Sequence, residues 1–384
     1  MRFEFATATR IVFGPGTLRE VGTTARELGR RALVVTGSAG RHGDRLLDLL
    51  AAEGVAVTTV AVVGEPTIHA VIAATDVARR NHCDLVIGLG GGSPIDAAKA
   101  VSALLTNPGD PFDYLEVVGR AQPITKLAAP CIAIPTTAGT GAEVTRNAVL
   151  TAPDRQVKVS LRSPLMLPRI AIIDPELTLD LPPALTASTG LDALTQLIEP
   201  YVSSRSNPLS DGFCIEGIGR VARALRAAFH DGANAAARED MALAGLLGGL
   251  ALANAGLGAV HGFAAPIGGM FPAPHGAVCA ALLPHVMEAN LRASRLQEPA
   301  GGIESRYAAI ARLLTGDAAS TPEKGIRWVG DLVAELGIPQ LRSYGITSES
   351  VSEIVAKAAR ASSMKANPLP LTSDELTAIL QAAL

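Results

Sequence analysis

The sequence predicts two domains: an α/β domain with a doubly wound, mostly parallel sheet over residues 1–180, and an all-helical domain over residues 181–384. The chain has 384 residues, and domains usually hold about 100–200 residues. Hydrophobic residues make up 48% of it, which is enough for sizeable cores. Short apolar runs alternate with amphipathic stretches in the first half and stop after about residue 182. That change of pattern sets the predicted domain boundary.

The candidate strands are five short apolar runs, rich in β-branched residues. They are apolar along their whole length, which indicates parallel strands buried on both faces. Two of them end in glycines, as strands that lead into a binding loop often do. The runs are residues 32–36, 55–63, 84–89, 131–135 and 170–173, and helical patterns at 43–53 and 69–81 lie between them.

The second half shows helical periodicity almost throughout. The stretch 241–260 has 20 residues without a charge, which is long enough to cross a bilayer. It contains five glycines and Asn254 and lacks flanking basic residues, so we expect a buried core helix. The predicted helices are residues 187–202, 209–229, 235–255, 278–291, 303–314, 322–336 and 350–359.

Charge and cysteine content exclude several protein classes. Lys and Arg number 33 and Asp and Glu 36, a net charge of −3, and aromatic residues make up 3%. Without a basic run, these values argue against a nucleic-acid-binding protein. The four cysteines form no CxxC pair, which argues against disulfides and a structural zinc site. The N-terminus lacks a signal-peptide core, so we expect a cytoplasmic protein with reduced thiols.

The segment GGGSPIDAAK follows the third apolar run. Three glycines end a buried strand, and a helix is expected to start with Ser93 as its N-cap and Pro94 as its first residue. The spacing is not GxGxxG, but such a turn brings backbone N–H groups to a phosphate. A tight turn that needs only glycine is the alternative. The candidate contacts are Gly91, Gly92, Ser93 and Asp96.

The segment PTTAGTGAEVT follows the fourth apolar run. Its hydroxyls and glycines can donate several hydrogen bonds to the ribose or phosphates of a cofactor. An ordinary Ser/Thr/Gly loop explains the same pattern equally well.

Two further motifs suggest a metal site. Asp192 and Gln196 are four residues apart and share one helix face. A carboxylate on an apolar helix needs a partner, which is either a metal or a backbone N–H. His261 and His275 lie 14 residues apart in the charge-free stretch 241–284. Imidazole and carboxylate together suit zinc or ferrous iron.

Together, the segments GGGSPIDAAKA, PTTAGTGAEVT, GLDALTQLIEPYVS and HGFAAPIGGMFPAPHGAVCAALLPHV resemble the iron-containing (group III) alcohol dehydrogenases. Their order and spacing match from Phe13 to about Glu288. The resemblance implies the dehydroquinate synthase-like/iron-containing alcohol dehydrogenase fold, with an interdomain cleft. It implies NAD(P)-dependent hydride transfer between the nicotinamide and an alcohol or carbonyl carbon. It also implies a divalent metal, iron or zinc, that polarises the substrate oxygen.

The resemblance assigns functional residues but no catalytic acid or base. The family's metal ligands fall on Asp192, Gln196, His261 and His275. Its phosphate-binding turn falls on Gly92 and Ser93. Its other cofactor contacts fall on Thr136, Thr137, Thr140, Thr145 and Lys158.

The chain departs from the family at three places. Gln196 takes the place of a histidine ligand, and its amide oxygen is a weaker donor for zinc. Ala265, four residues after His261, takes the place of a histidine proton relay. Gly37 takes the place of an acid that binds the adenosine ribose, so no carboxylate repels a 2′-phosphate. Ser38 or Arg41 could bind that phosphate, unless Arg41 is simply solvated, and we therefore expect NADP to be accepted as well as NAD.

Two alternative functions stay open at this point. A maleylacetate-reductase-like enzyme shares the fold, but the loop of that group is less like TTAGTG. A nucleotide-binding protein without catalysis would explain Gln196 and Ala265. We expect a homodimer that acts on a small alcohol or aldehyde, with no nucleic-acid or membrane partner.

Overall fold

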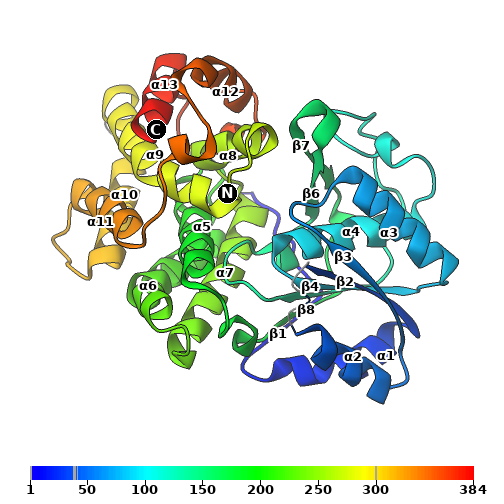
Figure 1. Ribbon diagram of the computed structural model, residues 1–384. Helices are drawn as coiled ribbons and strands as arrows, with labels where there is room; N and C mark the ends of the chain where they lie inside the picture. The colour runs from blue at the N-terminus through cyan, green and yellow to red at the C-terminus, as the bar shows by residue number, and fades with distance from the viewer. Residues whose placement is uncertain (1, 38–39, 41, 299–300) are drawn as a thin grey trace. The chain divides into compact units, whose positions relative to one another are not determined.

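The computed structural model describes residues 2–37, 40, 42–298 and 301–384, and these form two compact units. The sheet unit comprises Ala6–Thr137 and Gly141–Leu179. The helical unit comprises Ala138–Thr140 and Asp180–Leu384, together with the N-terminal segment up to Phe5. An α/β unit and a helical unit are the two parts of the predicted fold class, which is confirmed (Figure 1).

The sheet unit is built on six parallel strands in the order β1-β8-β5-β4-β2-β3. All five predicted strands are present, within one or two residues of their expected ends. The edge strand β1 was not predicted, because it has four residues and none of them is fully buried. The strands are β1 (Arg10–Phe13), β2 (Arg31–Gly37), β3 (Ala56–Val62), β4 (Leu85–Gly90), β5 (Cys131–Pro135) and β8 (Ile170–Ile173).

Helices cover both faces of this sheet, because alternate strand residues point to opposite sides. Leu33 and Val35 of β2 pack in a core with α3 (Ile68–Arg80) and α4 (Gly92–Thr106). Ala32 and Val34 pack in a second core with α1 (Val21–Leu28) and α2 (Gly43–Ala52). Figure 1 shows the two helical layers on either side of the strands. The sheet is therefore doubly wound.

A hairpin that the sequence analysis missed lies over α4. Strands β6 (Asn147–Ala152) and β7 (Val157–Arg162) pair antiparallel as a separate sheet. Along β6 fully buried residues alternate with half-buried ones, and β7 has only two fully buried residues, so neither strand is buried on both faces. The inward residues join the core that contains α3 and α4. The hairpin was not predicted because continuous apolar runs identify only strands that are buried on both faces.

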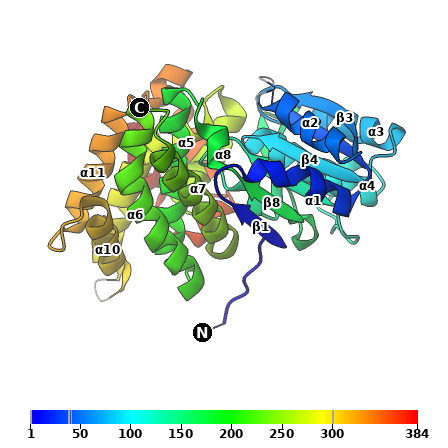
Figure 2. The ribbon, with the colours of Figure 1, turned by 90° about the horizontal axis from the view of Figure 1, so that it is seen from below.

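The helical unit contains all the predicted helices of the second half, together with α8 and α13. The sequence did not predict α8, which contains three glycines and Pro266. Figure 2 shows α5, α6 and α7 side by side, and their residues contact one another. The helices are α5 (Pro183–Val202), α6 (Pro208–His230), α7 (Ala235–Ala255), α8 (Ala259–Met270), α9 (His275–Gln297), α10 (Ile303–Thr315), α11 (Pro322–Glu335), α12 (Val351–Ala358) and α13 (Ser373–Ala382).

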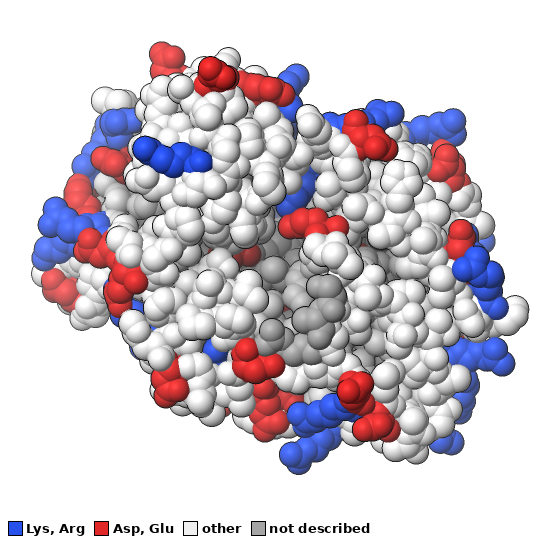
Figure 3. Space-filling model, viewed as in Figure 1, with Lys and Arg blue, Asp and Glu red and all other residues white. Residues whose placement is uncertain are grey.

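The charge-free stretch forms α7 from Met241 onward and the start of α8, and α7 is buried along most of its length. Among the described residues, no single helix has the length and hydropathy of a membrane span. By those two criteria α7 and α8 qualify only as a pair, and they are bent by 100° at the break between them. On the face drawn in Figure 3, basic and acidic side chains of the described residues are interspersed.

A fully buried lysine joins α4 to the segment that precedes the hairpin. The Lys99 ammonium forms an ion pair of 2.9 Å with Asp96. It also donates hydrogen bonds to the Ala142 carbonyl at 2.8 Å and to the Thr145 hydroxyl at 2.9 Å. The Asn147 carbonyl is a further acceptor. Since Lys99 gathers four acceptors, it fixes the loop after β5 against α4.

We expect Lys99→Met to lower the free energy of unfolding by about 3–5 kcal/mol, because it leaves Asp96 and three oxygens without their buried cation. Lys126→Met is the matched control, since Lys126 is exposed, and it should change stability by less than about 0.5 kcal/mol. Urea unfolding of the three proteins measures both effects. Equal midpoints for all three would contradict the structural role of Lys99.

Candidate functional site

The predicted phosphate turn joins the carboxyl end of β4 to the start of α4. The expectation that Ser93 caps this helix and Pro94 begins it is wrong. The helix begins at Gly92, and its N-cap is Gly91, which has no side chain to cap the helix. Gly90, with φ 149°, makes the turn that leads into it. The first N–H groups of α4 thus lack a side-chain cap, which suits an anion at the helix start.

The end of β5 lies beside this turn. The Thr136 N–H donates to the Gly90 carbonyl at 2.9 Å. A Cβ placed on Gly91 would lie 3.4 Å from the Thr137 side chain. The Thr137 hydroxyl is buried, and no described residue pairs with it. Uncapped N–H groups and an unpaired hydroxyl at the carboxyl ends of two neighbouring parallel strands form a site of the kind that binds nucleotide phosphates.

The remaining predicted cofactor contacts lie elsewhere. Asp96 and Thr145 are bound to Lys99, and Lys158 pairs with Glu65 at 3.2 Å. Thr140 belongs to the segment Ala138–Thr140 of the helical unit. Contact of these four residues with a cofactor stays a prediction. Gly37 ends β2, and Ser38 and Arg41 lie outside the described residues.

Three of the four predicted metal ligands converge inside the helical unit. Asp192 lies in the middle of α5, His261 in the first turn of α8, and His275 is the first residue of α9. The Asp192 Oδ1 atom lies 3.6 Å from Nε2 of His261 and 3.8 Å from Nε2 of His275. These distances are too long for hydrogen bonds, and Oδ1 has no hydrogen-bond partner among the described residues. Three ligand atoms thus surround a common point, which suits a divalent cation.

A fourth donor, Cys279, was not predicted. Its Sγ lies 3.8 Å from Nε2 of His261 and 3.7 Å from Nε2 of His275. The ligand atoms of Asp192, His261, His275 and Cys279 all lie within 4.8 Å of one another. The sequence held a signal for it, since Cys279 follows His275 by four residues and so shares its helix face. CxxC spacing does not reveal this cysteine, because its partner four residues away is a histidine.

Gln196, the fourth predicted ligand, contacts the cluster through its nitrogen. Its Nε2 donates to Oδ2 of Asp192 at 3.0 Å. Its Oε1 is buried without a partner among the described residues, and a Cβ on Gly248 would lie 3.5 Å from it. The amide therefore holds one oxygen of Asp192 and leaves the other, Oδ1, facing the two histidines.

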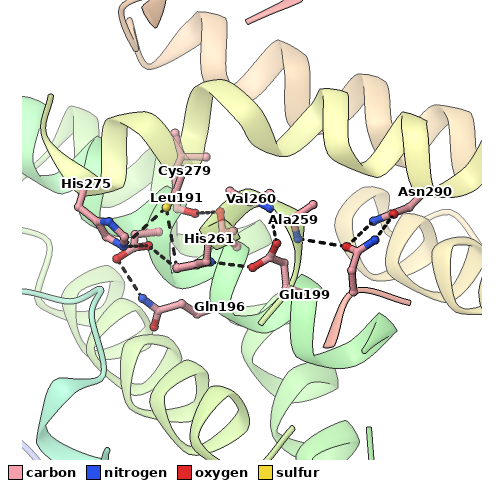
Figure 4. A network of polar contacts seen from close by, with 12 residues as sticks. Leu191, Gln196, Glu199, Ala259, Val260, His261, His275, Cys279 and Asn290 are labelled. Carbon is pink, nitrogen blue, oxygen red and sulfur yellow. Dashed lines mark hydrogen bonds and ion pairs between the residues drawn. The ribbon is translucent and has the colours of Figure 1, made fainter. Parts of the chain in front are cut away.

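A second residue that the sequence analysis missed orients His261. Buried Glu199 accepts a hydrogen bond from Nδ1 of His261 at 2.7 Å and another from the Val260 N–H at 2.7 Å (Figure 4). With Nδ1–H held by the carboxylate, the lone pair of Nε2 faces the cluster. Glu199 could have been found from sequence, since it follows Asp192 by seven residues and Gln196 by three on one helix face.

A buried pair of asparagines holds the start of α8 in place. The Asn367 Oδ1 accepts from the Ala259 N–H at 3.1 Å, and the Asn367 amide donates to Oδ1 of Asn290 at 2.8 Å. Together with Glu199, these side chains satisfy the N–H groups of Ala259 and Val260, which lack partners within the helix. The backbone that presents His261 is thereby fixed (Figure 4).

The neighbours in the cluster shift one another's pKa values. Burial alone would raise the pKa of Asp192, but the two histidines lower it below its ordinary value. Burial would lower the pKa of His261, but Cys279 and Glu199 raise it well above that of a free imidazole. Burial would raise the pKa of the Cys279 thiol, but the two imidazoles lower it. The shifts favour the anionic forms of Asp192 and Cys279, which can bind a cation, whereas His261 must lose a proton before its Nε2 can bind one.

Comparison with known proteins gives matches over almost the whole chain. The family model "Iron-containing alcohol dehydrogenase" matches residues 8–175, and the model of the C-terminal part of that family matches residues 186–384. The 1,3-propanediol dehydrogenase of Klebsiella pneumoniae is 37% identical over 389 aligned positions, which cover 99% of this chain and 98% of that protein.

Solved structures agree with these matches. A crystal structure of 1,3-propanediol oxidoreductase superposes with a TM-score of 0.92 at 36% identity and covers all of both chains. The sulfoacetaldehyde reductase of Bifidobacterium kashiwanohense, solved in complex with NAD+, superposes with a TM-score of 0.87 at 29% identity and covers 99% of this chain and 98% of that one.

The Glu199–His261 contact yields a prediction about metal affinity. In Glu199→Gln the amide cannot accept from both the imidazole N–H and the Val260 N–H, so His261 is held less well. We expect the zinc dissociation constant to rise roughly 10–100-fold, as changes behind a metal ligand usually do. Glu216→Gln, on the exposed face of α6, is the control. Titration with zinc and a competing chelator gives the dissociation constant for wild type and both variants. The same constant for all three would show that Glu199 does not support the metal ligand His261.

Proposed function

Because the chain belongs to the iron-containing alcohol dehydrogenase family, we propose that Asp192, His261 and His275 hold the metal with which it interconverts alcohols and aldehydes. The chain is an oxidoreductase that acts on CH–OH groups of small molecules and uses NAD(H). The observation that supports the metal assignment is the buried Oδ1 of Asp192, which lacks a hydrogen-bond partner in the described structure and faces two imidazoles.

The residues present fit a divalent ion such as zinc or ferrous iron, since they offer a carboxylate and two imidazoles. When bound there, the ion supplies Lewis-acid polarisation of the substrate oxygen. The protein's part is positioning. Gln196 fixes Asp192 through Oδ2, and Glu199 fixes the ring of His261 through Nδ1. Both contacts are buried, so the ligands need little rearrangement.

The turn at the start of α4 is the proposed site of the cofactor's pyrophosphate. Gly91, Gly92 and Ser93 offer backbone N–H groups at the positive end of a 15-residue helix. Thr137 adds a buried hydroxyl that lacks a partner in the described part of the chain. These features favour a nucleotide that presents the nicotinamide for hydride transfer, over a turn that needs glycine only for its shape.

We propose that NADP serves as well as NAD, on the ground that Gly37 ends β2 without a carboxylate. Strand β2 is next to β4, so Gly37 lies on the same sheet edge as the phosphate turn. A Cβ at Gly37 would lie 3.7 Å from Pro94, an ordinary contact, so the position accepts a Cβ without a clash. Assembly as a homodimer and a cytoplasmic location stay predictions from the sequence.

Steady-state reduction of small aldehydes tests this function. We expect wild type to use NADPH at least as well as NADH, judged by kcat/KM. Gly37→Asp should shift the ratio toward NADH by roughly 10–100-fold, because a carboxylate beside a 2′-phosphate costs about 1–3 kcal/mol. Gly37→Ala adds a side chain without the charge and should leave the ratio unchanged. A wild type that strongly prefers NADH, or an Asp variant that behaves like the Ala variant, would refute the cofactor proposal.

The phosphate turn is tested by binding alone. In Gly92→Val a branched side chain stands in the first turn of α4, where the phosphate would approach. We expect nucleotide binding, followed by quenching of intrinsic fluorescence or by calorimetry, to fall below detection. The control is Gly212→Val on α6, where a Cβ meets nothing within 4 Å. Wild-type affinity in the Gly92 variant would place the pyrophosphate elsewhere.

A further inference from the structure

We propose that the thiolate of Cys279 is the fourth protein ligand of the metal, in the role that an imidazole at position 196 would have had. The inference rests on the proposed function, since it concerns the same ion. It changes the expected ligand set from two imidazoles, a carboxylate and an amide to two imidazoles, a carboxylate and a sulfur.

The distances support a single four-ligand centre. The four measured separations between the ligand atoms of neighbouring residues are 3.6, 3.8, 3.8 and 3.7 Å. In tetrahedral zinc, with bonds of about 2.0–2.1 Å to nitrogen and about 2.3 Å to sulfur, two ligand atoms lie about 3.3–3.6 Å apart. These four separations are therefore only slightly wider than those of a zinc site, and the two remaining pairs of ligand atoms, Asp192 with Cys279 and His261 with His275, lie within 4.8 Å. Sγ of Cys279 is as close to both imidazoles as Oδ1 of Asp192 is.

The orientation of Gln196 removes it from the ligand set. Its amide nitrogen donates to Oδ2 of Asp192, and an N–H donor cannot bind a cation. Its oxygen lies toward Gly248 of α7. In this orientation the amide holds Oδ2 of Asp192, and its oxygen would have to turn away from Gly248 to reach the ion. Gln196 thus positions Asp192, and a fourth protein ligand would come from another element.

Cys279 is placed to be that donor. It lies one turn after His275 on α9, so one rigid helix presents both side chains. It is fully buried, and the atoms in contact with Sγ belong to the other ligands rather than to a disulfide partner. His275 is the most exposed of the four, with 34% of its side chain accessible. A substrate can therefore approach from that side, because four-coordinate zinc accepts a fifth ligand.

A thiolate changes the choice of metal. Sulfur is a soft ligand that favours zinc over ferrous iron, whereas carboxylate and imidazole alone accept both. We therefore infer that the chain is a zinc enzyme within a family named for iron.

Cobalt substitution tests the ligand directly and without activity. The purified protein is stripped with a chelator and titrated with Co²⁺, and the absorbance is recorded. A thiolate bound to Co²⁺ gives an intense near-ultraviolet charge-transfer band. We expect that band to saturate at one Co²⁺ per chain in wild type and in Cys214→Ser, whose buried thiol lies on α6. In Cys279→Ser the band should vanish, and the zinc dissociation constant should rise at least about tenfold.

The outcomes separate the two proposals. Stoichiometric Co²⁺ binding without the band, or a band that survives in Cys279→Ser, overturns Cys279 as a ligand and leaves the site of Asp192 and the histidines standing. Failure of wild type to bind Co²⁺ or Zn²⁺ overturns both. If Cys279→Ser does not fold, X-ray absorption of the wild-type zinc protein shows whether sulfur is among the zinc ligands. A sulfur neighbour at about 2.3 Å supports the proposal, and a shell of nitrogen and oxygen alone contradicts it.

Discussion

A buried carboxylate oxygen without a partner is the constraint on which the helical unit depends. Asp192 is 2% exposed, and its Oδ1 has no hydrogen bond from any described residue. An anion in such a place is costly unless a cation neutralises it. The surrounding chain has the arrangement that the proposed metal site requires. Helices α8 and α9 bring two imidazoles to the carboxylate, and Glu199 and Gln196 hold His261 and Asp192 in place.

The proposed phosphate site of the sheet unit consists, among the described residues at the start of α4, of backbone N–H groups rather than cationic side chains. Strands β4 and β5 end side by side, and glycines let α4 begin at that edge with its N–H groups uncapped. Lys99, the nearest buried cation of α4, is bound to the loop after β5 and shapes that loop. In the proposed site, backbone dipoles and the Thr137 hydroxyl would therefore contact the phosphates.

Much of this could be read from the sequence, and the failures have physical causes. The buried strands and long helices follow from uninterrupted apolar runs and helical periodicity. The β6–β7 hairpin was missed because only one of its faces is buried. Convergence of His261 and His275 depends on the turn between α8 and α9, which spacing does not determine. Glu199 and Cys279 lie at helical spacing from predicted ligands, so both can be predicted from residues that share a helix face with those ligands. The Gln196 amide donates to Asp192, and its oxygen lies beside Gly248 of another helix, a neighbour that sequence spacing does not reveal.

If the Asp192 cluster holds the metal as proposed, carbonyl reduction depends on that metal, while the nucleotide binds independently of it. The most direct measurement compares chelator-stripped and zinc-reconstituted protein in two assays, nucleotide binding and aldehyde reduction. We expect the stripped protein to bind nucleotide with unchanged affinity and to lose at least about a hundredfold in kcat, since Lewis-acid assistance contributes several kcal/mol. One zinc per chain should restore the rate. Equal rates for stripped and reconstituted protein would contradict the claim.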